Sequence, residues 1–201
     1  MNWNKLKSKI VAIGAGLVII GCGGGGKTAT VSFALTTTSA MQLAANNAEQ
    51  NYKSVKITVE KIEVHGDGWL EVPLAEPKTF DLMDLPNGLT APLGELKGLD
   101  AGKYTQIRLF LSKENAPKLI LADNSEHTLT VPSSQNTGLK IITPFEVAEG
   151  EELHLGLEFD VNHSIVEKGD GSYILKPVIK LIRLKSSLDN ENDDSDLDTA
   201  I

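Results

Sequence analysis

The sequence is poor in the residues that mark several common protein classes. Its 201 residues include a single cysteine, which excludes an intramolecular disulfide framework and a cysteine-rich zinc site. Lys and Arg number 19 against 27 Asp and Glu, so the clustered positive charge of nucleic-acid binders is missing and no nucleic-acid partner is expected. Hydrophobic residues make up 41% of the chain, enough for a core but too few for several membrane spans.

The N-terminus has the pattern of an export signal. Lys5, Lys7 and Lys9 precede residues 10–21, which are all apolar or glycine. As a helix this run would rise about 18 Å, short of the roughly 30 Å hydrocarbon core of a bilayer, so residues 1–21 are predicted to be a signal peptide.

The end of this segment predicts a lipid anchor. Ile19-Ile20-Gly21-Cys22 resembles the bacterial lipobox, in which the cysteine is lipidated and becomes the new N-terminus. Several acyl chains on Cys22 would hold the protein stably on a membrane. The alternative is a secretory signal in which Cys22 is incidental. Gly23 stands where an Asp would resemble an inner-membrane retention signal, so in a Gram-negative host we expect the outer membrane of the cell envelope.

Residues 21–28 also have the spacing of a nucleotide-binding P-loop, two glycines around four residues followed by Lys-Thr. Such a loop must open a helix whose N-terminal amides hold phosphate. Residues 29–36 instead alternate with period two and are rich in β-forming side chains, and no strand–helix–strand unit follows that would give Asp123 a role in nucleotide binding. We therefore expect no nucleotide, and interpret residues 22–28 as the lipidated cysteine and a glycine-rich tether.

Residues 29–185 consist of short apolar runs with strand periodicity, separated by turn residues. The clearest half-buried strand is 153–159. The parity of the apolar residues changes near Glu60 and Lys61, which predicts a β-bulge in one long strand or a break between two. Together these patterns predict an all-β fold, a single antiparallel β-sandwich of immunoglobulin-like or transthyretin-like type, with a small β-barrel as the alternative.

Other segments carry their own expectations. Residues 66–68, 123–126 and 169–171 predict tight turns between hairpin strands. Residues 178–184 are apolar on both parities, which predicts a central or final core strand. Residues 40–52 predict a short helix or an ordered loop.

The last residues, 186–201, hold six acids and no base. Such a segment buries too little apolar surface to order itself, so a solvated, disordered tail is predicted. Capture of divalent cations, or docking to a basic partner, is the alternative.

Several phrases of the second half resemble one family. They are YTQIRL at 104–109, VPSS at 131–134, GLKI at 138–141, FDV at 159–161 and GDGSYILKPVIK at 169–180. In this order they resemble the bacterial and archaeal lipoprotein family of the domain of unknown function 4382. The resemblance implies an exported, usually lipid-anchored β-sandwich with no established reaction. The Asp and Pro that commonly follow the family's first strand are missing at 35–40, which puts in doubt any site that would use that Asp.

Candidate site residues are few. Asp160, Asn162 and Ser164 have the spacing of a calcium loop, but Ile165 replaces the glycine such a loop needs. Asp81 is a further metal candidate, and for these acids we favour a role as caps of strands or turns, with no metal and no cofactor.

The remaining polar and aromatic candidates have structural interpretations. The histidines lack the spacing of a zinc helix, and no Gly-x-Ser-x-Gly motif is present. Trp69 is predicted to plug the core at one end of the sandwich rather than to form a ligand platform. Arg108 is predicted to face solvent or to pair with a carboxylate.

The sequence thus favours an exported, lipid-anchored, non-enzymatic structural or interaction module of the cell envelope. Its expected partners are the membrane, through the lipid on Cys22, and an unidentified protein or glycan. A ligand-binding module for carbohydrate or Ca²⁺ is the alternative, and a hydrolase is the third hypothesis.

Overall fold

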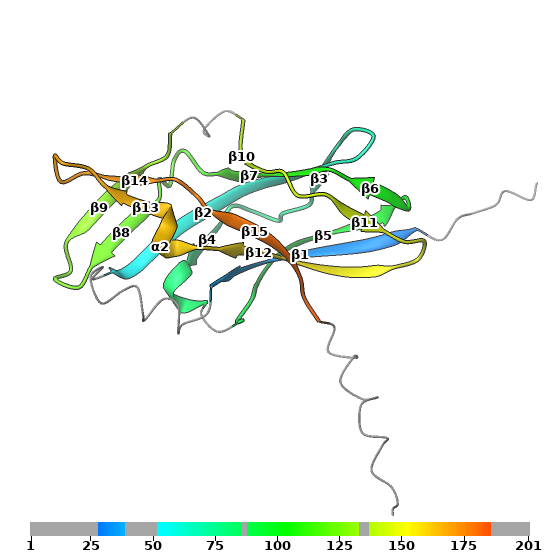
Figure 1. Ribbon diagram of the computed structural model, residues 1–201, viewed down its shortest axis with the longest axis horizontal. Helices are drawn as coiled ribbons and strands as arrows, with labels where there is room; N and C mark the ends of the chain where they lie inside the picture. The colour runs from blue at the N-terminus through cyan, green and yellow to red at the C-terminus, as the bar shows by residue number, and fades with distance from the viewer. Residues whose placement is uncertain (1–27, 39–51, 86–87, 133–136, 186–201) are drawn as a thin grey trace, which may run out of the picture.

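The computed structural model shows two main β-sheets packed on one another (Figure 1), with a third sheet of only two short strands beside them. The structure describes residues 28–38, 52–85, 88–132 and 137–185. Cys22, the tail at 186–201 and nearly all of the 40–52 segment lie outside the described residues. The predicted all-β sandwich is confirmed, and the two sheets do not close into a barrel in the described part of the chain. None of the described helices is long and apolar enough to cross a membrane.

The smaller sheet has four strands in the order β15–β12–β1–β5. Their bounds are β1 Ala29–Thr37, β5 Ala91–Leu99, β12 Glu152–Phe159 and β15 Ile179–Arg183. β1 runs parallel to β12, with Thr30 beside Glu152 and Phe33 beside Leu155, whereas the other two pairings are antiparallel. The pairing is therefore mixed rather than antiparallel throughout.

The larger sheet is built around β2, a strand of 14 residues. Its strand order is β10–β7–β2–β8–β9–β14–β13, while β3 and β4 pair with β2 outside this path. The bounds are β2 Tyr52–His65, β3 Trp69–Val72, β4 Lys78–Asp81, β7 Gln106–Leu111, β8 Lys118–Leu121, β9 Glu126–Thr130, β10 Leu139–Ile141, β13 Ile165–Glu167 and β14 Tyr173–Leu175. Two short helices, η1 (Leu82–Asp84) and α2 (Val161–Ser164), and the pair β6 (Gly102–Tyr104) and β11 (Phe145–Val147) complete the described elements.

The parity change near Glu60 is a bulge within β2. The register between β2 and β7 shifts between Val59 and Lys61, so β2 continues as one strand instead of breaking in two. Beside the bulge, β7 gives way to β8, and the backbone N–H of Ser112 donates to the carbonyl of Thr58 at 2.8 Å. The bulge turns the apolar residues on both sides of Glu60 toward the same core.

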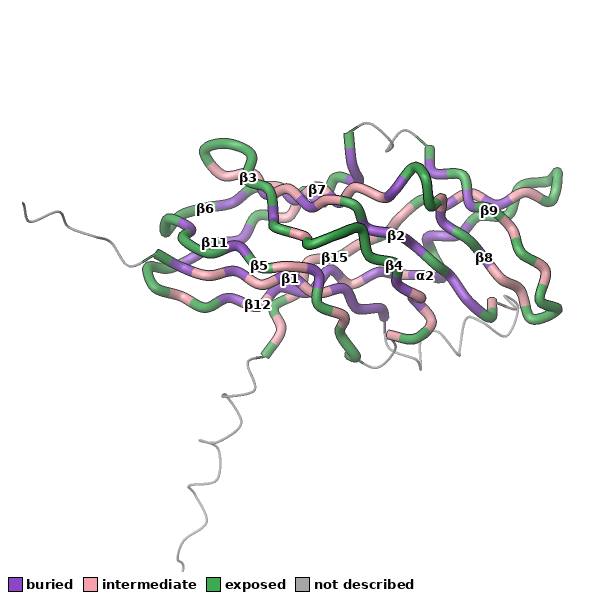
Figure 2. The backbone as a smooth tube through the Cα atoms, turned by 180° about the vertical axis from the view of Figure 1, so that it is seen from behind, coloured by how far each residue is buried: buried purple, intermediate pink, exposed green. Residues whose placement is uncertain are grey.

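The core lies between the inner faces of the two sheets, where the buried stretches of the backbone concentrate (Figure 2). Alternate residues of the paired strands supply it, as strand geometry requires. They include Val31, Phe33 and Leu35 of β1, Leu153, Leu155, Leu157 and Phe159 of β12, Ile57, Ile62 and Val64 of β2, and Ile107 and Leu109 of β7. Each such side chain contributes roughly 1.5–3 kcal/mol by its burial.

The predicted hairpin turns are present. Residues 66–68 join β2 to β3, residues 122–125 join β8 to β9, and residues 168–172 join β13 to β14. The last two turns have the same hydrogen bonds, and Asn124 and Gly171 both adopt positive φ at equivalent positions. The two hairpins lie next to each other because β9 pairs with β14.

The sequence predicts a central or final core strand at residues 178–184, and the structure agrees only in part. β15 is the last strand, but it forms an edge of the smaller sheet and its residues are exposed or half-buried. Ile179 and Leu181 are half-buried and pack against the core, whereas Ile182 lies on the outer face over Gly156, its register partner in β12. A Cβ at Gly156 would lie 2.8 Å from Ile182 Cγ1, so the isoleucine occupies that space.

The connection between β3 and β4 covers part of β5, which yields a test of the packing. A Cβ at Gly94 would lie 2.8 Å from both the carbonyl oxygen of Pro73 and Val72 Cγ1. Gly94→Ala is therefore expected to lower the free energy of unfolding by about 1–3 kcal/mol, measured by urea denaturation. Gly169→Ala is the control, since a Cβ there meets nothing within 4 Å, and its effect should stay within about 0.5 kcal/mol. Equal midpoints for the two variants would contradict this packing.

Candidate functional site

An open groove of about 730 Å³ crosses the outer face of the smaller sheet. Its floor lies along β1, which presents the small side chains of Ser32 and Ala34 outward while Phe33 faces the core. On one side the wall is Leu184, just after β15, and on the other it is Pro92 in β5. Small residues on a central strand between bulkier neighbours are what makes this face concave.

A serine–histidine hydrogen bond lies on the floor of the groove. Ser32 Oγ and His154 Nδ1 are 2.6 Å apart. The two residues are register partners in the parallel pairing of β1 with β12, so both side chains leave the sheet on the same face. His154 Nε2 lies 3.9 Å from a carboxylate oxygen of Glu152.

The charges around the groove are few and balanced. Among its lining residues are one carboxylate, Glu95, and one ammonium group, that of Lys185. Glu95 sits directly across from Ser32 in the pairing of β1 with β5, and its carboxylate lies 3.1 Å from Lys97 Nζ. The groove therefore offers hydroxyl, imidazole, carboxylate and ammonium groups without a strong net charge.

The Ser32–His154 pair has part of the geometry needed for nucleophilic catalysis. A serine within hydrogen-bond reach of a histidine, with a carboxylate behind the ring, is the arrangement that activates a hydroxyl. Acyl transfer also requires free donors for the oxyanion. β1 is paired on both sides through Ser32, so the backbone N–H groups there are used in the sheet. These N–H groups are therefore not free to hold an oxyanion beside Ser32.

The predicted metal candidates act as caps. Asp81 precedes η1, where its carboxylate accepts hydrogen bonds from the Ser54 hydroxyl and from the backbone N–H groups of Val55 and Met83, both at 3.1 Å. These bonds tie the start of η1 to β2.

Asp160 caps α2 in the same manner. It accepts from the backbone N–H of His163 at 3.2 Å, and its other oxygen lies 2.8 Å from His163 Nδ1. Asn162 is buried, and its side-chain oxygen has no hydrogen-bond partner among the described residues. No group of three His, Cys, Asp or Glu side chains that could hold a metal ion occurs in the described ranges.

The hairpin turns at residues 123–125 and 170–172 also hold carboxylates, again as turn caps. In each turn the serine hydroxyl donates to the aspartate at 2.6 Å, Ser125 to Asp123 and Ser172 to Asp170. These serine hydroxyl bonds, with a backbone N–H bond from the same serine, lower the pKa of both aspartates below their usual value. Both carboxylates are thus held by their own turns.

The prediction that Trp69 plugs the core is wrong. Trp69 pairs with His65 on the outer face of the larger sheet, and its side chain is 38% exposed. The guanidinium carbon of Arg108 lies 3.7 Å from the centre of the Trp69 ring, and Arg108 also pairs with Glu63 at 3.8 Å, as the sequence suggested. Because Arg108 covers the ring, the flat face is not available as an open platform for a sugar.

The same outer face carries Lys61 between Glu63 and the ring of Phe110. Lys61 Nζ lies 2.7 Å from a Glu63 oxygen and 4.6 Å from the centre of the Phe110 ring. The hydrogen bond to Glu63 raises the pKa of Lys61 above its usual value. These contacts make a ladder of paired charges and rings, which stabilises the outer face of β2.

Sequence reasoning did not find the Ser32–His154 pair. The two residues are separated by 122 positions, and their contact depends on the parallel register of β1 with β12. One signal was present: each is a polar residue on the outward parity of its strand, between inward residues that are apolar, Val31 and Phe33 in β1 and Leu153 and Leu155 in β12.

The fold defines the protein as an all-β sandwich, and a family assignment follows from its sequence. The profile of the family described as "Domain of unknown function (DUF4382)" matches residues 28–177, which is most of the chain. The protein therefore belongs to the DUF4382 family. No curated protein and no solved structure matches the chain.

Proposed function

We propose that this protein is a lipid-anchored, non-enzymatic binding module of the cell envelope, in the outer membrane if the host is Gram-negative. Support for the anchor comes from the apolar run at 10–21 and from the single cysteine of the chain, which stands at the position a lipobox requires. The tether at 22–28 would then lead directly into β1 at Ala29.

The groove on the smaller sheet is the proposed ligand site. The observation that carries this proposal is the Ser32–His154 hydrogen bond on the floor of an open groove, with Glu95 and Lys185 also lining it. Ligand pockets combine apolar walls with a few placed polar groups, and this groove does so. Its balanced charge suits an uncharged ligand.

Carbohydrate is the ligand class that this chemistry favours. Sugar hydroxyls both donate and accept, so they can be matched by a carboxylate, an imidazole, a hydroxyl and an ammonium group together. Calcium is less well served, because Asp81 and Asp160 are bound to their own helix starts and Glu95 already faces Lys97. A neutral glycan segment is therefore the proposed ligand.

The anchor is tested by Cys22→Ala. The variant should move from the membrane fraction to the soluble envelope fraction, because it has no thiol to carry acyl chains. Intact mass of the wild-type protein should show cleavage before residue 22 and added acyl mass. Unchanged fractionation of the variant would contradict the lipid anchor.

The ligand site is tested by a glycan array followed by calorimetry on the best glycan. Ser32→Ala and His154→Ala should each weaken binding by about tenfold, the effect of losing roughly one hydrogen bond to the ligand. Ser125→Ala and His127→Ala are matched controls, since they form another serine–histidine contact, at 3.2 Å, in a hairpin at the far end of the protein. An array without binding, or equal losses in both pairs, would contradict the proposed site.

A further inference from the structure

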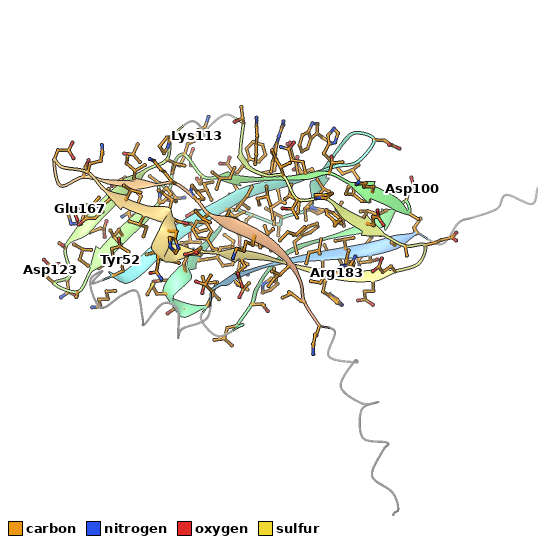
Figure 3. The ribbon with its side chains drawn as sticks, in the orientation of Figure 1. Tyr52, Asp100, Lys113, Asp123, Glu167 and Arg183 are labelled. Atoms are coloured by element: carbon orange, nitrogen blue, oxygen red, sulfur yellow. The ribbon has the colours of Figure 1, made fainter. Side chains whose placement is uncertain are left out.

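Two exposed apolar side chains lie at the end of the sandwich where β1 begins. Trp69 and Leu70 are 38% and 41% exposed. Residues 66–68 and Leu70 line a hollow of about 280 Å³ with residues 96–104, and Leu99 in that second segment is the register partner of Ala29. We call this end, made of residues 66–70 and 96–104, the anchor end; Figure 3 labels Asp100 there.

The opposite end of the sandwich carries the two similar hairpins. At this end β8 pairs with residues 52–56 of β2, and the sheet continues from β8 to β9, β14 and β13 (Figure 1). Val166 in β13 is 37% exposed, about as much as Trp69. A strand of 14 residues such as β2 extends over about 45 Å, so the two ends are well separated.

A lipid on Cys22 would keep the anchor end near the bilayer. Even fully extended, the chain from Cys22 to Ala29 spans at most about 25 Å. The membrane surface therefore stays within that distance of Ala29. Because the tether is short, the effective concentration of lipid at the anchor end is high.

The side chains at the anchor end suit a bilayer interface. Tryptophan, with an apolar ring and one polar N–H, is enriched at the level of the lipid headgroups. The guanidinium of Arg108 lies over the Trp69 ring on the outer face of the larger sheet. Leu70 is the register partner of Val64, so its side chain leaves β3 on the opposite face and lines the hollow, and this end carries an apolar side chain on each face.

The charges of the anchor end indicate which lipids it fits. Its hollow is lined by two carboxylates, Asp67 and Asp100, and by two lysines, Lys97 and Lys103. Burial, together with the nearby Asp100 and Asp67, raises the pKa of the Tyr104 hydroxyl, which donates to the Asp100 carbonyl at 3.0 Å. Balanced charge of this kind fits zwitterionic headgroups better than a strongly anionic surface.

We propose that the anchor end rests on a zwitterionic bilayer, with Trp69 and Leu70 inserted at the headgroup level and the hairpins at 122–125 and 168–172 directed away from the membrane. This inference rests on the proposed lipid anchor at Cys22. It leaves the groove on the smaller sheet facing sideways, open to a ligand in the space beside the membrane.

Tryptophan fluorescence tests the proposal without any label. The sequence has two tryptophans, Trp3 and Trp69, and removal of residues 1–21 leaves Trp69 alone. The full mature, lipidated protein is reconstituted into phosphatidylcholine–phosphatidylethanolamine vesicles containing a phosphatidylcholine brominated near the headgroup end of its chains. Trp69 emission should shift to the blue and be quenched by the brominated lipid. The reference is the same protein in the supernatant after a lipase has released it from the vesicles, without detergent.

The matched control moves the tryptophan to the far end. In Trp69→Phe combined with Val166→Trp, the fluorophore has nearly the same exposure but lies in β13, and it should show neither the shift nor the quenching. Trp69→Phe with Leu89→Trp is a second control if the first does not fold, because Leu89 is 59% exposed and its carbonyl binds Thr36 near the far end of β1.

The outcomes separate this inference from the anchor itself. Flotation of the vesicles reports whether the protein is lipid-anchored at all; a protein that does not float refutes the anchor and the inference with it. A protein that floats while Trp69 is unquenched keeps its anchor but overturns the proposed contact. Equal quenching at residues 69 and 166 would show a domain lying on its side, which also overturns the proposal.

Discussion

The parallel pairing of β1 with β12 is the contact on which the rest of the structure depends. It joins residues 29–37 to residues 152–159, more than 100 positions apart, and both strands are central in the smaller sheet. Their inward side chains form one side of the core. Their outward side chains form the floor of the groove, including the Ser32–His154 hydrogen bond. Loss of this register would remove the core and the candidate site together.

The same pairing determines which parts of the chain share an end. Because the two strands run in the same direction, Ala29 and Glu152 begin together beside Leu99, while Thr37 and Phe159 end together. The start of β1 therefore lies at the end of the sandwich where β3 carries the exposed Trp69 and Leu70. The capped helix α2 follows the other end of β12. A single register thus gives the molecule a proposed membrane end, a far end and a lateral face for a ligand.

Local features of the fold could be predicted from the sequence, and pairings could not. The change of parity near Glu60 predicted the bulge, and the glycine-rich turns predicted the hairpins, because periodicity and turn chemistry act between neighbouring residues. The partner of β1 depends on contacts between distant segments, so the parallel register and the Ser32–His154 pair were missed. Trp69 was misplaced because its environment comes from Arg108 on another strand. Asp160 was interpreted correctly as a cap, since capping is local.

The direction of the β1–β12 pairing can be measured by disulfide formation in a Cys22→Ser background. Thr30→Cys with Glu152→Cys places two thiols on register partners, whose Cα atoms in neighbouring strands lie about 5 Å apart, within the range a disulfide can bridge. Mild oxidation should close this bond, seen as the loss of two hydrogens in the intact mass. The control pair is Thr30→Cys with Glu158→Cys. These two residues would be register partners if Phe33 stayed opposite Leu155 but β12 ran antiparallel to β1. A disulfide in that second pair, and none in the first, would contradict the structure described here.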